Sequence, residues 1–276
     1  MNIRRTVITA AGQDQHQLPL QRLVDGDGIA KSALAIIIGE AVEAGADEIA
    51  VVVRPGSEEA FRAAAGTAAS RLELIVQSEP RGYGDAIRLA RAFVGDEPFL
   101  HFVGDHLYVS GGRRRCAEQV VAVARDRGCA VSAVQATREH LLPFFGTVGG
   151  RRIAGEERLY DVTTVVEKPT PTRAEQDLIV PGLRAGHYLC FFGIHVLPPT
   201  VFGLLDELGE TGSRQLSAAL ALLAERERYL AHEVDGTRHN LGPTYGLLAA
   251  QVAIALSGPD RDEVLTLLAE QLLRQP

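Results

Sequence analysis

The feature that most constrains this chain is a regular alternation of short apolar strands and helical patterns over its first half. Strands are predicted at residues 6–12, 48–56, 72–77, 98–105 and 129–137, and helices at residues 32–46, 57–71 and 85–92. Such alternation with short connections is typical of a mostly parallel sheet that helices cover on both faces. The sequence therefore predicts an α/β fold of the Rossmann-like kind.

From residue 138 the rhythm changes. The segments "FFGTVGG", "YDVTTVVEKP" and "HYLCFFGIHVLPP" are rich in β-formers and punctuated by glycine and proline, which predicts an inserted β layer beside the first sheet. Amphipathic helices and one strand, "RYLAHEVDG", follow. We expect one large domain over 1–242 and a C-terminal helical extension of the same domain over 243–276, whose last helix serves packing or oligomer formation.

Charge and composition exclude several classes of protein. A formal net charge of −7 disfavours broad attraction to nucleic acid or to an anionic membrane surface. No apolar stretch approaches the length of a membrane span. Cys116, Cys129 and Cys190 lie far apart and form no metal or redox motif, so reduced structural thiols and a cytoplasmic location are predicted.

Three residues fall at or just beyond predicted strand ends, namely Gly12, Gln77 and Asp105. Sheets of this kind bind ligands at the carboxyl ends of their strands, so one crevice can collect all three. Gly12 lacks a Cβ and lets backbone N–H groups approach a phosphate, although a plain strand-to-loop turn would show the same pattern. Asp105 suits either a turn or a hard cation.

The turn "QSEPRGYGDAI" carries a second group of candidates. Gln77 offers a donor and an acceptor on one amide, which matches the edge of a pyrimidine base. Gly82 permits close approach of the backbone to that base. The competing interpretation is an ordinary Gly-Tyr-Gly turn.

Taken together, the collinear segments resemble the nucleotide-sugar pyrophosphorylases, and most closely the UTP–glucose-1-phosphate uridylyltransferases. The segments are a strand with a glycine loop, "EAVEAGADEIAVVV", "QSEPRGYGDAI", "VGDEPFLHFVGDH", "FFGTV", "VVEKP", "GIHVL" and "QLSAAL…HNLG…YGLLAAQ". The resemblance implies a nucleotidyltransferase fold, a nucleoside triphosphate (UTP) and a sugar 1-phosphate (glucose 1-phosphate) as substrates, Mg²⁺, release of pyrophosphate, and a homo-oligomer.

On the nucleotide side, the resemblance assigns Ala11 and Gly12 to the triphosphate. It assigns Gln77 and Gly82 to the base and Asp105 to Mg²⁺. The resemblance thus implies that the crevice at the strand ends holds a nucleotide together with its metal ion.

On the sugar side, the resemblance places Gly146 and Gly193 where the backbone passes close to the sugar ring. Glu167 is expected to accept hydrogen bonds from sugar hydroxyls, and Lys168 to hold the sugar phosphate. His195 stands where relatives often carry an aromatic residue, and its role is open.

The N-terminal loop departs from the family pattern. Gln15 and His16 stand where threonine and arginine are expected, and Asp14 adds a negative charge near the phosphates. A neutral histidine cannot replace a fixed guanidinium. Arg22 and Lys31 are the local cations that remain, and we take them as candidates for the catalytic role of the family's lysines.

The second departure is Asn240 in "RHNLG", where relatives carry an aspartate that binds the same metal ion as Asp105. An amide oxygen contributes no charge, so Mg²⁺ affinity should fall. An alternative function therefore stays open, that of a catalytically impaired homologue that binds nucleotide or sugar phosphate as a regulatory or structural partner. A dinucleotide-dependent oxidoreductase is disfavoured because "AAGQDQ" is not a G-x-G-x-x-G turn.

Overall fold

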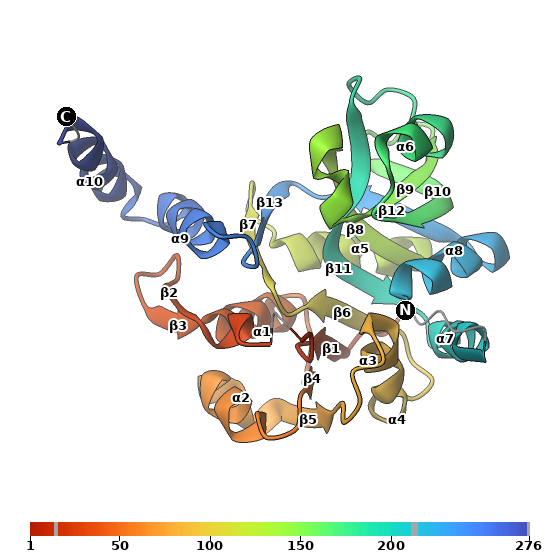
Figure 1. The fold of residues 1–276 in the computed structure, drawn as a ribbon, viewed down its shortest axis with the longest axis horizontal. Helices are drawn as coiled ribbons and strands as arrows, with labels where there is room; N and C mark the ends of the chain where they lie inside the picture. The colour runs from red at the N-terminus through yellow and green to blue at the C-terminus, as the bar shows by residue number, and fades with distance from the viewer. Residues whose placement is uncertain (14–15, 211–214, 275–276) are drawn as a thin grey trace.

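The structure is a computed structural model that describes residues 1–13, 16–210 and 215–274 (Figure 1). A nine-stranded sheet forms its centre. The strand order is β5 (Leu72–Val76), β4 (Glu48–Val53), β1 (Arg5–Thr9), β6 (Phe99–Val103), β11 (His187–Leu197), β8 (Ala130–Arg138), β12 (Tyr229–Glu233), β10 (Leu159–Glu167) and β9 (Gly146–Arg152). The first four of these strands run parallel, as their alternation with helices predicted.

Helices cover both faces of the sheet. On one face lie α1 (Ala33–Glu43), α2 (Glu58–Ala64) and α5 (Cys116–Arg127). On the other lie α3 (Tyr83–Leu89), α4 (Arg91–Val94), α7 (Thr200–Glu210) and α8 (Leu216–Arg226). Local signals set the helix ends: the Ser32 hydroxyl caps α1 by accepting from Ala35 N at 2.9 Å, and Gly128 ends α5 in the left-handed region. The predicted α/β fold is confirmed.

The strands expected as an inserted layer are hydrogen-bonded into the main sheet. β11 runs antiparallel to β6 and β8, and an irregularity between Phe191 and His195 divides it. Its first half also pairs with β9, which pairs with β10. Above this half, η3 (Glu139–Phe144) and α6 (Pro171–Asp177) enclose a small separate core around Tyr188.

Two short sheets were not expected from the sequence. Part of the predicted loop 13–30 forms a 3₁₀ turn, η1 (Leu18–Leu20), and a hairpin of β2 (Arg22–Val24) with β3 (Ala30–Ser32). β7 (His106–Ser110) follows β6 after two residues and pairs with β13 (Gly236–Asn240). β2 and β3, at three residues each, are too short for an apolar pattern to show in the sequence, and β7 lies so close after β6 that the sequence does not separate the two.

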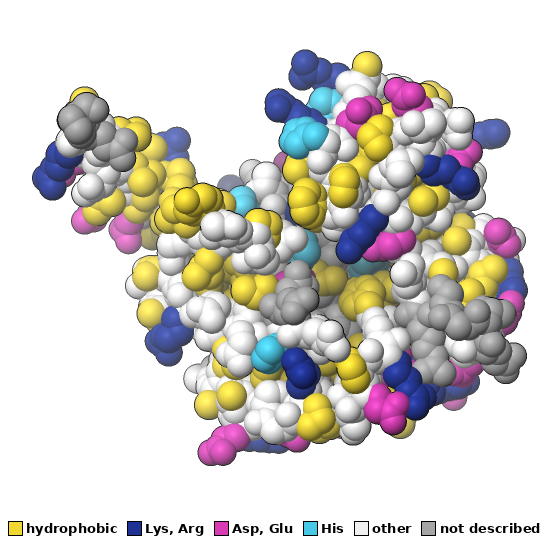
Figure 2. Space-filling view, viewed as in Figure 1, with side chains coloured by type: hydrophobic (Ala, Val, Ile, Leu, Met, Phe, Trp, Pro, Cys, Tyr) yellow, Lys and Arg dark blue, Asp and Glu magenta, His cyan; other side chains and the backbone are white. Residues whose placement is uncertain are grey.

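The chain ends in α9 (Gly246–Ser257) and α10 (Arg261–Leu273). α9 is attached to β2 because the Gln251 amide bonds both backbone groups of Val24, at 2.8 and 2.9 Å. α10 buries no residue and points away from the body, with hydrophobic side chains gathered over it (Figures 1 and 2). Within the described parts of the chain, no helix has the length and apolarity needed to cross a membrane.

Candidate active site

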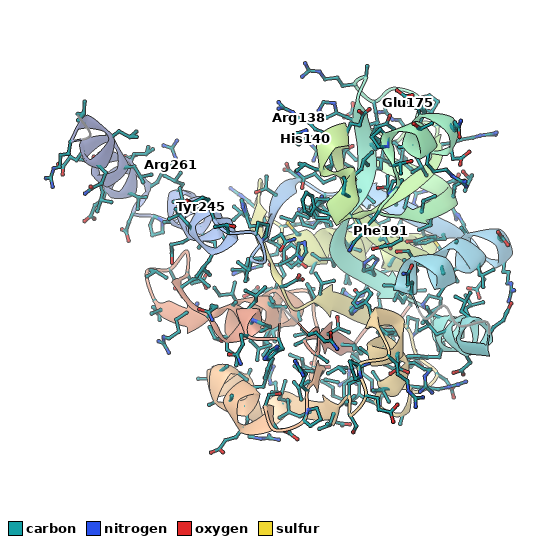
Figure 3. The ribbon with its side chains drawn as sticks, viewed as in Figure 1. Arg138, His140, Glu175, Phe191, Tyr245 and Arg261 are labelled. Atoms are coloured by element: carbon teal, nitrogen blue, oxygen red, sulfur yellow. The ribbon has the colours of Figure 1, made fainter. Side chains whose placement is uncertain are left out.

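A cavity of about 560 Å³ opens beside β11, where the elbow after β5 meets the end of β10. Figure 2 shows this face hollowed near its middle. Gly82 and Tyr83 line the cavity from the elbow, and Val103 from the end of β6. Phe191 projects toward it from β11 (Figure 3). The cavity therefore lies at the carboxyl ends of parallel strands, where such sheets bind ligands.

The sugar-side candidates come together in this cavity. Glu167 and Lys168 line it from the end of β10, and the Ser217 hydroxyl donates a hydrogen bond to Glu167 Oε2. Lys168 is exposed, and its side chain forms no ion pair with any described residue. Its φ of +46° makes it the one non-glycine residue of the described chain in the left-handed region. Lys168 N donates to Phe145 O at 3.2 Å, so a hydrogen bond ties the left-handed backbone of Lys168 to the cavity wall.

Gly146 and Gly193 line the same cavity, and neither position has room for a side chain. A Cβ on Gly146 would lie 2.7 Å from Phe191 Cδ2 and 2.9 Å from Glu167 Oε2. A Cβ on Gly193 would lie 2.6 Å from Val103 Cγ2, and its φ of +93° favours glycine. All four residues predicted for the sugar side are thus neighbours, and their roles stay predictions.

Of the two residues predicted to contact the base, only Gly82 lines the cavity. Gly82 lines the cavity with a φ of +107°, but Gln77 does not line it and is 6% exposed. The Gln77 amide nitrogen donates to Asp85 Oδ2 at 3.0 Å and to Gly82 O at 3.2 Å. Gln77 therefore shapes the elbow in this structure, and any contact with a base would be made by its carbonyl oxygen.

The residues predicted for phosphates and metal lie next to the cavity. The turn at Gly104 touches the end of β1, since Gly104 N donates to Thr9 O at 2.9 Å. Ala11 is buried and Gly12 exposed just beyond that strand, so the glycine loop and Asp105 occupy adjacent strand ends. Neither Ala11, Gly12 nor Asp105 lines the cavity itself.

Asp105 and Asn240 are neighbours. Leu241 N donates to Asp105 O at 2.9 Å, and Asn240 pairs with His106 across β7 and β13. His106 Nδ1 donates to Asp105 Oδ1 at 2.8 Å. Burial alone would raise the pKa of the Asp105 carboxyl, but the charge and hydrogen bond of the His106 ring outweigh it and the pKa is lowered. The carboxylate is therefore ionised at neutral pH.

Arg22 and Lys31, the candidates for the catalytic role of the family's lysines, do not line this cavity, and that role stays a prediction. They line a different groove of about 890 Å³, between the β2–β3 hairpin, α1 and η2 (Gly66–Arg71). The Lys31 ammonium pairs with the carboxylates of Asp25 and Asp27, each at 2.6 Å. These ion pairs close the hairpin, so the charge of Lys31 is used locally.

Of the altered N-terminal loop, Asp14 and Gln15 lie outside the described residues. His16 lies at its end, where its ring Nδ1 donates to Gln13 O at 3.0 Å. Sequence reasoning missed Arg54, which follows β4 and donates from Nη1 to Gln13 O at 3.3 Å. The signal was present, because Arg54 directly follows an apolar strand in "VVVRPG", and Asp105 likewise comes after the apolar run of another strand.

Tyr83, on the wall of the cavity, meets a buried histidine below the cavity. Its hydroxyl lies 2.6 Å from His101 Nε2, and His101 Nδ1 lies 2.9 Å from Val7 O. Since Val7 O can only accept, Nδ1 carries the proton and Tyr83 donates to Nε2. Burial lowers the pKa of His101 to about 4, so the ring is neutral at pH 7.

Residues 28–251 match the family described as Nucleotidyl transferase, so the chain belongs to that family. The match begins after the altered residues 14–16 and includes β3, the cavity and the first half of α9. The family is one of enzymes that transfer nucleotidyl groups, and this favours an enzyme over a catalytically impaired binding homologue.

Among curated proteins, the chain is 28% identical to UTP--glucose-1-phosphate uridylyltransferase 1 of Streptococcus pyogenes serotype M1, over 95% of this chain and 92% of that protein. Two solved structures share the fold. One is a UTP-bound UGPase from Acinetobacter baumannii, with a TM-score of 0.76 and 22% identity, over 98% of this chain and 99% of the other. The second is a UDP-glucose pyrophosphorylase complexed with UDP-glucose, with a TM-score of 0.74 and 23% identity, over 91% and 98%.

Proposed function

We propose that the protein transfers a uridylyl group from UTP to glucose 1-phosphate and releases pyrophosphate. The observation that carries this proposal is the cavity in which Gly146, Glu167, Lys168 and Gly193 meet the glycine elbow at Gly82. The names of the curated relative and of the solved structures given above include these compounds or the product UDP-glucose, which supports the choice of substrates.

In the proposed reaction, a phosphate oxygen of the sugar phosphate attacks the α-phosphorus of the triphosphate. The bond from that phosphorus to the bridging oxygen breaks, and pyrophosphate leaves with the electron pair. Such a reaction asks for little covalent chemistry from the protein, because positioning and charge neutralisation supply most of the rate. We assign the sugar hydroxyls to Glu167 and the sugar phosphate to Lys168.

The residues at the end of β6 fit a divalent cation in part. Asp105 supplies one ionised carboxylate and Asn240 one amide oxygen, and Mg²⁺ commonly binds through one or two carboxylates plus substrate phosphates. No cluster of three or more His, Cys, Asp or Glu side chains suited to a metal occurs in the chain as described, so triphosphate oxygens would complete the site. Mg²⁺ bound there would neutralise charge on the triphosphate.

The loop that follows β1 would meet the triphosphate, through backbone N–H groups near Ala11 and Gly12. We assign to Arg54 the fixed positive charge that His16 cannot give. The support is its place at the carboxyl end of β4, beside β1, and its hydrogen bond to Gln13 O in the loop.

The proposed function is tested by measuring pyrophosphate release with UTP, glucose 1-phosphate and Mg²⁺, alongside TTP, GTP and ATP and alongside galactose 1-phosphate. UTP with glucose 1-phosphate is expected to give the highest kcat/KM. Binding of UTP without turnover in any combination would contradict the proposal and favour the impaired homologue. Asn240→Asp should lower the Mg²⁺ concentration needed for half-maximal rate, and His16→Arg should lower KM for UTP.

We also propose that the chain forms a homo-oligomer through α10 and works in the cytoplasm. α10 exposes Leu265, Leu267, Leu272 and Leu273, and a second copy of the chain could cover them. Three buried free thiols suit a reducing compartment. Light scattering on the full chain and on a chain ending at residue 258 checks the first point: a molar mass of one chain for both would contradict it.

A further inference from the structure

A chain of three buried side chains runs beneath the cavity, across neighbouring strands. Tyr229 on β12 and Ser132 on β8 join their hydroxyl oxygens at 2.5 Å, and Ser132 Oγ lies 2.6 Å from His195 Nδ1 on β11. Each of the three side chains is at most 2% exposed. His195 nevertheless lines the cavity, so the chain of hydrogen bonds ends at the ligand site.

The protons in this chain can be placed by counting donors. Tyr229 and Ser132 each have one hydroxyl proton, and Ser132 is the single hydrogen-bond partner of the Tyr229 hydroxyl among the described residues. If Ser132 donated to Tyr229, the buried phenol proton would have no acceptor. If Tyr229 donates to Ser132, the Ser132 proton goes to His195 Nδ1, and both hydroxyl protons have an acceptor.

This order fixes the tautomer of His195. A ring that accepts at Nδ1 carries its proton at Nε2 when it is neutral. Burial, and to a smaller extent the nearby His101 ring, hold the pKa of His195 well below its usual range. The ring is therefore neutral at pH 7. His101 stacks on His195 with 5.8 Å between ring centroids and has the opposite tautomer, with its proton on Nδ1.

The surroundings of His195 place it on the sugar side. The Phe191 ring meets it edge-on with centroids 5.1 Å apart, and Phe191 bounds the space at Gly146. Glu167 lies against the same glycine. A neutral N–H on this wall suits a hydroxyl oxygen better than a phosphate, because a phosphate is better served by the Lys168 ammonium, which lines the same cavity.

We propose that Tyr229 and Ser132 lock His195 in its Nε2–H form, and that this N–H donates to a hydroxyl of the sugar phosphate and so selects the sugar. The inference rests on the proposed function for the identity of the ligand, but the tautomer lock does not depend on it. In these terms His195 is a specificity residue, and Ser132 and Tyr229 are positioning residues.

The tautomer lock is tested on the ligand-free protein by long-range ¹H–¹⁵N spectra of its histidines at pH 7, with His195→Asn and His101→Asn used for assignment. We expect His195 to be protonated at Nε2 and His101 at Nδ1. In Ser132→Ala, the His195 signals should shift toward a mixture of tautomers. A wild-type His195 protonated at Nδ1 would overturn the proposal.

The sugar contact is tested by a pair of substitutions at one position. His195→Asn keeps an acceptor for Ser132 but loses the donor at Nε2, whereas His195→Gln keeps a donor near the place of Nε2. His195→Asn should raise KM for glucose 1-phosphate about tenfold with KM for UTP unchanged, the size expected for one lost hydrogen bond. His195→Gln should recover part of the loss, and Ser132→Ala should give a smaller rise.

Tyr160→Phe and Ser110→Ala serve as matched controls, because their hydroxyls bond Glu233 and Cys116 outside the cavity. Both should leave the KM values unchanged. Equal loss toward both substrates in His195→Asn, or no loss, would overturn the sugar contact. Absence of turnover in the wild type would instead count against the proposed function, and the spectra would still decide the tautomer lock.

Discussion

The two sides of the candidate site differ in how they are built. On the sugar side, Gly146, Glu167, Lys168 and Gly193 lie at or within strands β9, β10 and β11, and all four line one cavity. On the nucleotide side, the candidates sit mainly in loops and turns. Gln77 is engaged inside its own elbow, and Lys31 is paired within a hairpin.

The difference shows that the element that carries a residue decides how well its position follows from sequence. A residue in a strand inherits its place from the ladder of backbone hydrogen bonds, so a pattern that predicts the strand also predicts the site. A residue in a loop or short hairpin can satisfy its charge with a local partner, as Lys31 does with Asp25 and Asp27. Its type alone does not say where the charge goes.

The sharpest test of this comparison sets Lys168 against Lys31. Lys168→Met should lower kcat/KM for glucose 1-phosphate by about 100-fold or more, because a positioned charge at a transferred phosphate contributes on this scale. Lys31→Met should change it by less than about threefold, since the Lys31 charge is paired within the hairpin and Lys31 does not line the cavity. Steady-state kinetics with both substrates measure the difference in kcat/KM between the two variants. A comparable loss in both variants would end the distinction between the two sides.

The stability of the protein should fall in acid because of His101, which is buried below the cavity. In the folded protein the pKa of His101 is about 4, against about 6.5 in the unfolded chain. Below pH 6.5 this histidine therefore binds a proton in the unfolded chain but not in the folded protein. The stability of the fold falls as the pH drops toward 4. The loss from this residue between pH 7 and pH 5 is roughly 2 kcal/mol.

Urea unfolding of the wild type and of His101→Asn at pH 7 and pH 5 measures this loss. The variant should lose less stability on acidification, because its amide does not titrate. His140→Asn is the matched control, since His140 is exposed at the edge of η3 (Figure 3). An unchanged pH dependence in His101→Asn would show that other groups carry it.

Gly146→Ala probes the space on the sugar side. The added methyl would approach both Phe191 and the Glu167 carboxylate to less than 3.0 Å, so both side chains must move. We expect KM for glucose 1-phosphate to rise about tenfold while KM for UTP changes little, a loss in the range that overpacking produces. Gly203→Ala in α7 is the control, because its Cβ would meet no atom within 4 Å. A rise in KM for UTP alone would place the sugar elsewhere.

The smallest effect is expected at Arg238, next to the metal candidates. Its guanidinium lies over the Phe145 ring, 3.7 Å from the centroid, and its Nη1 is buried without a hydrogen-bond partner in the described structure. Burial lowers the pKa of this guanidinium to about 10. Arg238→Met keeps the packing and removes the charge, so thermal unfolding should show a gain of about 1 kcal/mol. A loss of stability would mean that the contact with Phe145 and the hydrogen bond from Nη2 to Thr137 Oγ1 together outweigh desolvation.

Much of the fold follows from the sequence. The strands at 6–12, 48–56 and 98–105 were predicted from apolar runs, and their parallel pairing from the helices between them. β2 and β3 were not predicted because three residues each carry too little periodicity, and β7 was not predicted because it follows β6 after only two residues and is not separated from it in the sequence. They exist because a distant partner or a local ion pair holds them.

Within the candidate site, the residue types predicted several residues that line the cavity but not the hydrogen-bonded side chains beneath it. The hydrogen bonds among Tyr229, Ser132 and His195 join three strands far apart in sequence. No spacing rule links such residues, and only the strand order β11-β8-β12 brings them together. Arg54 follows an apolar strand, as Asp105 does, and this feature marked it as a candidate. It was missed because an arginine after a strand is common at protein surfaces.

The backbone at Lys168 limits how this scaffold could be improved. A left-handed conformation at a residue with a Cβ costs on the order of 1 kcal/mol, which glycine or asparagine would relieve. Selection for heat resistance alone would thus replace the one lysine that faces the cavity. A programme of directed evolution that screens for survival at high temperature should therefore screen for turnover in the same round, or it will enrich well-folded proteins that have lost their substrate.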